Sequence, residues 1–296
     1  MTKTAMITIC GRPNVGKSTL TNALVGEKIA IVSPKPQTTR SRITAIVSHG
    51  DTQFVLLDTP GFHKPRTRLG DYMVNVVRES VADVDCVLLL VEPIPSVGPQ
   101  EEALIERLRQ AKVPALLVIN KIDTVDKAGL LAVMAVYAAA FDFDAILPVS
   151  AKTGDGLDEL LAEMEKYAAE GPHLFPDDMI TDQPERQICA ELVREKLLRC
   201  LDREIPHGTA VEVTKFAERE NGIVDLEVTI FCEKESHKGI IIGKKGAMLK
   251  KIGELARHDI EDFLGTKVNL QTWVKVRENW RDSMASLRNF GYSDQN

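Results

Sequence analysis

The sequence contains few cysteines, and their spacing indicates neither a metal site nor a disulfide framework. No two of them form a C-x-x-C pair, and their count is odd. Zinc sites and disulfide-stapled domains are typically built from paired, closely spaced cysteines, so neither is expected here. We therefore expect reduced thiols at all five positions: Cys10, Cys86, Cys189, Cys200 and Cys232.

A long hydrophobic run is also missing. The longest nearly unbroken apolar stretch, residues 129–141, is too short to cross a bilayer and predicts a core helix instead. The N-terminus, MTKTAMITICGRPN, lacks the long apolar segment and the small-residue cleavage site of a signal peptide. No internal repeat or low-complexity segment is present. These absences predict a cytoplasmic protein.

The first half of the chain alternates two kinds of pattern. Short runs rich in valine, isoleucine and leucine predict strands buried on both faces, as in a parallel sheet; they lie at 5–10, 54–58, 86–91, 115–120 and 145–150. Helical patterns lie between or after them, at 18–26, 99–111 and 157–170. Strand–helix alternation of this kind predicts an α/β domain over residues 1–170.

The pattern changes in the second half. Residues 171–184 are rich in proline and aspartate and predict a linker. A helix then follows from Glu185, and two alternating runs flank Asn221-Gly222, a strong hairpin signal. A glycine loop, a helix, a strand and a last helix from Glu278 complete this half. With 296 residues, the chain therefore predicts a second domain over residues 185–296.

A phosphate-binding loop is predicted at residues 11–18. GRPNVGKS follows a predicted strand and opens a helix, and it matches G-x-x-x-x-G-K-[ST]. The glycines allow the backbone to curl so that its N–H groups face a phosphate at the helix N-terminus. Lys17 is expected to neutralise the β- and γ-phosphates, and the Ser18 hydroxyl to bind Mg²⁺.

Three further motifs follow predicted strands: DTPG at 58–61, NKID at 120–123 and SAK at 150–152. Open α/β sheets bind their ligands at the carboxyl ends of the strands, where all these motifs are expected to meet. Asp58 is expected to hold Mg²⁺ through water, and the Gly61 N–H to sense the γ-phosphate. The backbone of the SAK motif could contact the base.

The NKID motif predicts selectivity for guanine. The Asp123 carboxylate can accept hydrogen bonds from both N1–H and the exocyclic amine of guanine. Adenine lacks that amine and presents an acceptor at N1, so it would leave the carboxylate unpaired. Losses of this kind are worth on the order of 10⁴-fold in selectivity in comparable polar pockets.

These motifs together resemble those of translation-factor-related GTPases, and two segments resemble the Era family in particular. Residues 33–42, SPKPQTTRSR, are similar to its switch I, and residues 58–73, DTPGFHKPRTRLGDYM, to its switch II. The resemblance implies GTP and GDP as substrate and product, with Mg²⁺. A switch I threonine would bind the metal in the GTP state; Thr38 and Thr39 are both available, and the register favours Thr39.

The motifs give a set of expected site residues. Lys17, Thr39 and Gly61 are expected to act in catalysis, and Ser18, Thr39 and Asp58 at the metal. The residues expected to contact the nucleotide are Gly11, Arg12, Pro13, Asn14, Val15, Gly16, Lys17, Ser18, Thr19, Asp58, Thr59, Pro60, Gly61, Phe62, Asn120, Lys121, Asp123, Ser150, Ala151 and Lys152.

Phe62 stands where many GTPases place the glutamine that orients the attacking water. Phenylalanine has no hydrogen-bonding group, so we expect slow intrinsic hydrolysis unless the backbone, another residue or a partner positions the water. Asn14 offers one compensation, because a loop asparagine helps hold K⁺ against the phosphates in some similar GTPases. Asn14 either does this or only shapes the loop.

A second glycine loop, GKKG at 243–246, has no following Lys-Ser pair and so does not predict a nucleotide site. It matches the G-x-x-G loop with which KH domains clamp single-stranded nucleic acid. Residues 234–257 carry a net charge of +5 within a chain of net charge −6, as expected for a nucleic-acid-binding face. The residues expected to bind RNA are Ile242, Gly243, Lys244, Lys245, Gly246, Lys250 and Lys251.

The element order of the second half resembles a type II KH domain, and its place after the GTPase half again resembles the Era family. That resemblance implies a ribosome-assembly factor that binds near the tail end of the small-subunit ribosomal RNA, as a monomer. It also implies peripheral membrane association, for which the sequence shows no anchor. A competing interpretation is an RNA-binding module that holds GTP only as a structural ligand.

Overall fold

The computed structural model describes residues 1–62, 65–81 and 83–292 and contains two compact units. The first comprises Met1–Ala30, Thr39–Pro65 and Met73–Asp182. The second comprises Ile31–Thr38, Arg66–Tyr72 and the described residues from Gln183 onward. The chain therefore enters the second unit twice before reaching the linker expected at 171–184, most of which belongs to the first unit.

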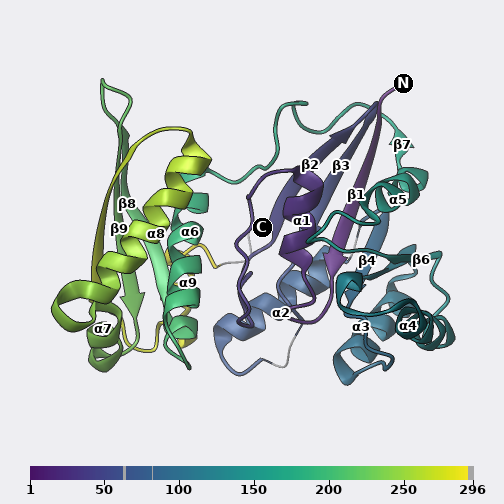
Figure 1. Ribbon diagram of the computed structural model, residues 1–296, viewed down its shortest axis with the longest axis horizontal. Helices are drawn as coiled ribbons and strands as arrows, with labels where there is room; N and C mark the ends of the chain where they lie inside the picture. Colours follow the sequence, from purple (N-terminus) through teal and green to yellow (C-terminus); the bar gives the residue numbers. More distant parts are fainter. Residues whose placement is uncertain (63–64, 82, 293–296) are drawn as a thin grey trace. The chain divides into compact units, whose positions relative to one another are not determined.

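The first unit is built on a sheet in the order β2-β3-β1-β4-β5-β6, with β7 paired to β1 (Figure 1). Its strands are β1 (Lys3–Cys10), β2 (Ile43–His49), β3 (Thr52–Asp58), β4 (Cys86–Val91), β5 (Ala115–Ile119), β6 (Ala145–Pro148) and β7 (Ala169–Glu170). The pairings are parallel except for β2 with β3 and β7 with β1. The strand order diverges to either side of β1, which is where such sheets bind ligands.

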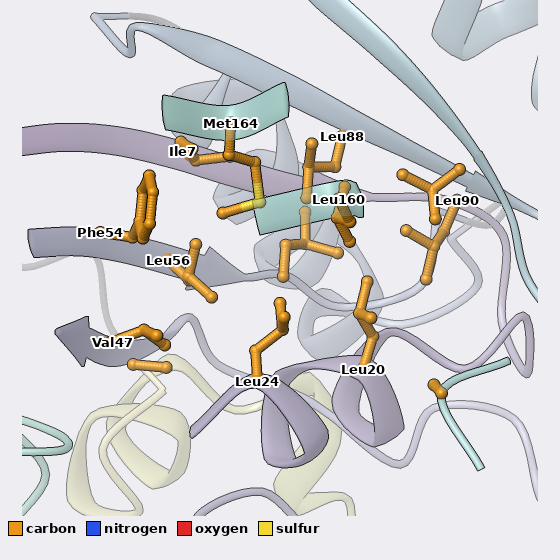
Figure 2. Close-up of a cluster of buried hydrophobic side chains, with 14 of the residues drawn as sticks. Ile7, Leu20, Leu24, Val47, Phe54, Leu56, Leu88, Leu90, Leu160 and Met164 are labelled. Carbon is orange, nitrogen blue, oxygen red and sulfur yellow. The ribbon is translucent and has the colours of Figure 1, made fainter. Parts of the chain in front are cut away.

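Helices cover both faces of this sheet. They are α1 (Lys17–Val25), α2 (Arg68–Ser80), α3 (Pro99–Ala111), α4 (Lys127–Ala140) and α5 (Leu157–Met164). One core contains side chains of α1 and α5, with Leu20, Leu24 and Met164 packed against the sheet residues Phe54 and Leu56 (Figure 2). A second core contains side chains of α2, α3 and α4. The mixed α/β fold with a largely parallel sheet is thus confirmed.

Several elements differ from the sequence prediction. Strand β2 was not predicted, because its residues lie next to the segment interpreted as switch I. Helix α2 lies within and beyond the segment interpreted as switch II, of which His63 and Lys64 fall outside the described residues. The helix predicted at 157–170 ends at Met164, and Ala169–Glu170 instead pair antiparallel with β1. The last helix begins at Met284, after a 3₁₀ turn at Trp280–Asp282.

The helix predicted at 129–141 is present as α4, and one of its faces packs against a core. Helix α4 lies at the surface, with only Val133 and Tyr137 buried among its residues. Leu131 is 66% exposed, and the remaining exposed positions are mostly alanines, whose small side chains add little apolar surface. Apolar composition therefore did not separate a surface helix from a core helix here.

The second unit has its own sheet, in the order β10-β9-β8, and its own core. Its elements are α6 (Glu185–Cys200), β8 (Ala210–Glu218), β9 (Val224–Cys232), α7 (Glu235–Ile242), α8 (Ala247–Leu264), β10 (Val268–Val276) and α9 (Met284–Asn289). β9 pairs antiparallel with β8 and parallel with β10. The predicted hairpin turn is present, with Gly222 at a φ of 79°.

The described residues bear on two expectations from the sequence, one about membrane-spanning helices and one about the cysteines. Across this part of the chain, no helix has the length and apolarity needed to cross a bilayer. The five cysteines are free thiols, and all except the half-buried Cys200 are buried.

Candidate functional site

The predicted phosphate-binding loop, residues 11–18, connects β1 to α1 at the divergence point of the sheet. Gly16 has a φ of 101°, and a Cβ there would lie 2.3 Å from the Asn120 Nδ2 atom. A Cβ on Gly11 would lie 2.5 Å from the Leu90 carbonyl oxygen. Both positions therefore require glycine, and the loop lies tightly against the ends of β4 and β5.

Lys17 is a buried cation at the start of α1. Its side chain is folded against its own loop, where Nζ donates to the carbonyl oxygens of Gly11 at 3.2 Å and Arg12 at 3.0 Å. Burial lowers the pKa of Lys17, and the nearby Asp58 carboxylate opposes that shift. A phosphate could replace these neutral carbonyl acceptors with charged oxygens, which form stronger hydrogen bonds to a desolvated ammonium.

The expected metal-binding oxygens lie together. Ser18 Oγ donates to Asp58 Oδ2 at 2.7 Å and lies 2.8 Å from Thr39 Oγ1. Asp58 is fully buried, and its Oδ1 atom has no hydrogen-bond partner. Burial raises the pKa of Asp58 to about 6, although Lys17 and hydrogen bonds from Ser18 and Thr59 oppose the shift. Such a desolvated carboxylate beside two hydroxyls fits Mg²⁺, which prefers oxygen ligands.

The strand pairing accounts for this convergence. In the register of β1 with β3, Ile9 lies opposite Asp58, so the phosphate loop and the DTPG motif start side by side. Thr59 Oγ1 donates to the Ile9 carbonyl oxygen at 2.8 Å, which fixes the turn after β3. A Cβ on Gly61 would lie 2.8 Å from Pro13 Cα, so this position also requires glycine.

The residues expected to read the base form a second group. Asn120 is buried and bridges two segments: its Nδ2 donates to the Val15 carbonyl oxygen at 2.8 Å, and its Oδ1 accepts from Ala151 N at 3.0 Å. Ser150 Oγ donates to Asp123 Oδ1 at 2.8 Å. Asp123 itself is exposed, with its carboxylate oriented by the serine. The NKID and SAK motifs are thus fastened to each other and to the phosphate loop.

Sequence reasoning missed Glu92, which connects these two groups. Its carboxylate pairs with Arg12 of the phosphate loop and with Lys121 of the NKID motif. Lys121 Nζ also donates to the Asn14 carbonyl oxygen at 2.6 Å, and Arg12 pairs with Glu101 at 3.1 Å. A carboxylate directly after the predicted strand at 86–91, at the ligand-binding edge of the sheet, was the signal that could have identified it.

Phe62 is half-buried against the core beneath α3, and the Arg107 guanidinium carbon lies 4.7 Å from its ring centroid. Its backbone N–H donates to the Gly11 carbonyl oxygen at 3.1 Å. The phenyl ring therefore packs as a hydrophobic anchor for this segment.

The second glycine loop lies between α7 and α8, within the second unit. Gly243 has a φ of 73° and a ψ of 175°, a region nearly exclusive to glycine, and a Cβ there would lie 2.7 Å from Met248 Cβ. Gly246 has a φ of 80° and precedes the first residue of α8. Lys244 and Lys245 are exposed at this helix N-terminus, and Lys250 and Lys251 are exposed on α8. The loop presents cations and helix N–H groups together, as an anion-binding surface requires.

The three isoleucines before this loop differ in how deeply they are buried. Ile241 is fully buried in the core of the second unit, Ile242 is half-buried, and Ile240 is 49% exposed. One side chain thus anchors α7 while another remains accessible beside the loop.

Comparison with known proteins identifies the family. GTPase Era of Ruminiclostridium cellulolyticum is 52% identical over 290 residues, covering 98% of this chain and 97% of that protein. The chain belongs to the Era family of GTPases. GTPase Era of Clostridioides difficile strain 630 is 51% identical over 297 residues, covering 100% of both chains. The family resemblance drawn from the switch segments is thereby confirmed.

Domain models and solved structures agree with this family assignment. A model described as 50S ribosome-binding GTPase matches residues 6–121, and a KH domain model matches residues 204–281. Two crystal structures of Era are 37% identical with TM-scores of 0.94. One, a variant from Aquifex aeolicus bound to GDP and AlF₄⁻, covers 98% of this chain and 99% of its own. The other holds MgGDPNP and nucleotides 1506–1542 of 16S ribosomal RNA and covers 99% and 100%.

Proposed function

We propose that this chain is a GTP-driven switch that binds single-stranded ribosomal RNA and assists assembly of the small ribosomal subunit. One observation supports the proposal. The first unit brings together the residues expected to bind the phosphates, the metal and the guanine base, and the second unit of the same chain contains a G-x-x-G loop. The 37%-identical relative that holds MgGDPNP together with 16S ribosomal RNA nucleotides supports the pairing of these two ligands. We also propose that the protein is a cytoplasmic monomer that associates peripherally with the inner face of the membrane.

In this proposal each part of the nucleotide site has a separate role. Lys17 and the loop N–H groups neutralise and hold the phosphates. Ser18 and Thr39 would supply oxygen ligands to Mg²⁺, Asp58 would hold the ion through water, and the ion would offset negative charge on the phosphates. The Gly61 N–H contacts the γ-phosphate. Asp123 selects guanine, and Asn120 keeps the base-reading and phosphate-binding segments in register.

Hydrolysis is expected to respond to the monovalent cation. If Asn14 helps hold K⁺ against the phosphates, replacing Na⁺ by K⁺ at constant ionic strength should raise the hydrolysis rate. Asn14 has a φ of 66°, so Asn14→Ala would also strain the loop. Asn14→Gly keeps that conformation accessible and removes only the side chain.

The K⁺ response should therefore disappear in both Asn14→Gly and Asn14→Ala. Steady-state phosphate release in matched KCl and NaCl buffers measures the effect. Equal rates of the unmodified protein in the two salts would refute the proposed cation site. A K⁺ response retained in Asn14→Gly would leave Asn14 as a residue that only shapes the loop.

The RNA-binding half of the proposal is tested at the glycine loop. Lys245 has a φ of 52°, so asparagine, which tolerates this region, is the better replacement there. The double variant Lys244→Ala, Lys245→Asn should bind single-stranded RNA more weakly and hydrolyse GTP normally in the absence of RNA. If each lysine meets a phosphate, the slope of log affinity against log salt should flatten by about 1.4, at roughly 0.7 per contact.

A matched control removes the same charge elsewhere. Lys127 and Lys166 carry side chains on the surface of the first unit, and Lys127→Ala, Lys166→Ala should leave the slope unchanged. RNA binding measured by fluorescence anisotropy across a salt series supplies both values. A loop variant with the slope and affinity of the unmodified protein would mean that GKKG is a lysine-rich turn without an RNA role.

A further inference from the structure

Three neighbouring strands of the first unit are each followed by a charged residue at the ligand-binding edge of the sheet. Strand β4 lies between β1 and β5, and it pairs in parallel with both. Arg12 follows the end of β1, Glu92 directly follows β4, and Lys121 follows the end of β5. The charges along this edge therefore alternate, with one carboxylate between two cations.

The Glu92 carboxylate uses a different oxygen for each cation. Its Oε2 atom pairs with the Arg12 guanidinium, and its Oε1 atom accepts a hydrogen bond from Lys121 Nζ. Each cation has a further partner: Lys121 Nζ donates to the Asn14 carbonyl oxygen at 2.6 Å, and Arg12 pairs with Glu101 at 3.1 Å. All five residues belong to the first unit. One carboxylate thus connects the phosphate loop to the NKID motif.

The backbone that carries Glu92 is held from both sides. The carbonyl oxygen of the preceding residue, Val91, accepts from the Asn120 N–H at 2.9 Å. On the other side, the Leu90 carbonyl oxygen lies so close to Gly11 that a Cβ there would approach it to 2.5 Å. Both Val91 and Leu90 are fully buried. A carboxylate at such a rigid strand end can fix two long, flexible side chains in place.

A guanine nucleotide has to contact the phosphate loop and the NKID motif at the same time, because it carries the phosphates and the base in one molecule. It gains affinity from both contacts only when the two segments are held at the spacing that the nucleotide spans. Inorganic pyrophosphate can occupy the phosphate loop alone, so its affinity does not depend on that spacing.

We propose that Glu92 is a positioning residue that holds the phosphate loop and the NKID motif at the spacing a bound guanine nucleotide requires. The inference rests on the proposed function, in which both segments contact one nucleotide. Asn120 shares this task through its hydrogen bond to the Val15 carbonyl oxygen, so loss of Glu92 should weaken nucleotide binding without abolishing it. GDP and GTP span both segments and should be affected alike.

Charge alone predicts the opposite result. Removing a carboxylate beside a site for phosphates leaves two cations less compensated, and this would strengthen the binding of every phosphate ligand, most of all at low salt. Loss of positioning would instead weaken the binding of guanine nucleotides and spare pyrophosphate. The direction of the change in GDP affinity therefore separates the two effects.

The main test is Glu92→Gln in the full-length chain with Mg²⁺. Glutamine keeps the shape of the side chain, but its one amide oxygen can accept from only one cation, and its amide nitrogen would face the other donor to donor. Arg12 and Lys121 are 29% and 37% exposed, so solvent screens part of the loss. We expect GDP affinity to fall about tenfold, as equilibrium titration measures. Pyrophosphate affinity, measured by displacement of labelled GDP, should be unchanged or higher.

Glu92→Asp tests the same role without a change of charge. Aspartate is one methylene shorter, so it cannot reach both cations from the same backbone position, and GDP affinity should fall about threefold. Glu92 is 25% exposed, so both variants should fold. Glu106→Gln is the matched control, because it removes from α3 of the same unit a carboxylate that pairs with Arg109 at 3.2 Å. It should leave the affinities for GDP and pyrophosphate unchanged.

Unchanged or tighter GDP binding in Glu92→Gln would overturn the positioning role. An equal loss of affinity for GDP and pyrophosphate would also overturn it, because Glu92 would then only maintain the phosphate loop. Asp123→Ala separates these outcomes from failure of the proposed function. If Asp123→Ala loses GDP affinity while both Glu92 variants keep it, the nucleotide site stands and only the positioning role fails. If Asp123→Ala binds GDP as the unmodified protein does, the NKID motif does not contact the base, and the proposed function and the inference fail together.

Discussion

Replacing Asp123 by asparagine should transfer the preference of the site from GTP to xanthosine triphosphate. Asp123 Oδ1 accepts from Ser150 Oγ at 2.8 Å, and an asparagine oxygen can accept the same bond. The new amide nitrogen would then face the base. It would meet the exocyclic amine of guanine donor to donor, but it could donate to the carbonyl that xanthine carries at that carbon.

The expected change in the ratio of the two affinities is on the order of 10⁴-fold, as for other pockets built around a buried polar match. Competitive displacement of a labelled nucleotide by GTP and by xanthosine triphosphate measures it. Asp123→Ala is the matched control, since it loses the guanine contacts without gaining a donor and should bind both nucleotides weakly. A GTP preference retained in Asp123→Asn would rule out this residue as the base reader.

The motifs of the candidate nucleotide site could be picked out from the sequence because their chemistry depends on local spacing. A phosphate loop needs Gly11, Gly16 and Lys17 at fixed intervals, and the glycines prove to be required by contacts with Leu90 and Asn120. The same spacing could not reveal those contacts, because they come from β4 and β5. The motif therefore indicated where a phosphate loop lies, and the tertiary contacts explain why two of its positions require glycine.

Glu92 could have been identified only by its place directly after a predicted strand, and Arg194 and Glu195 had no such signal. Each is one charged residue among many in a chain that is 27% charged, and its significance depends on partners distant in sequence. Arg194 and Glu195 lie in the helix that the sequence predicts from Glu185. Nothing in that pattern indicates that these two charged residues are buried, with hydrogen bonds to a segment about 160 residues earlier.

The surface position of α4 and the missed strand β2 have a related cause. Hydrophobic periodicity reports the faces of an element but not how many neighbours cover it. The alanines of α4 are compatible with either a core or a surface helix, because a methyl side chain has little apolar area to bury in a core or to expose at a surface. The β2 residues are largely buried and pair antiparallel with β3 at the edge of the sheet, but no element was predicted for them because they follow directly on the segment interpreted as switch I.

Replacing Lys17 by alanine should lower kcat/KM for GTP by a factor on the order of 10²–10³, as for removal of one charged or hydrogen-bonding group from a developing negative charge. The fold should persist, because the hydrogen bonds of Lys17 to Gly11 and Arg12 lie within its own loop. Circular dichroism and RNA binding by the second unit verify this independently of the nucleotide. Lys127→Ala, an exposed lysine at the start of α4, controls for loss of one positive charge and should hydrolyse GTP normally. If the folded Lys17→Ala protein hydrolysed GTP at the rate of the unmodified protein, Lys17 would have no catalytic role.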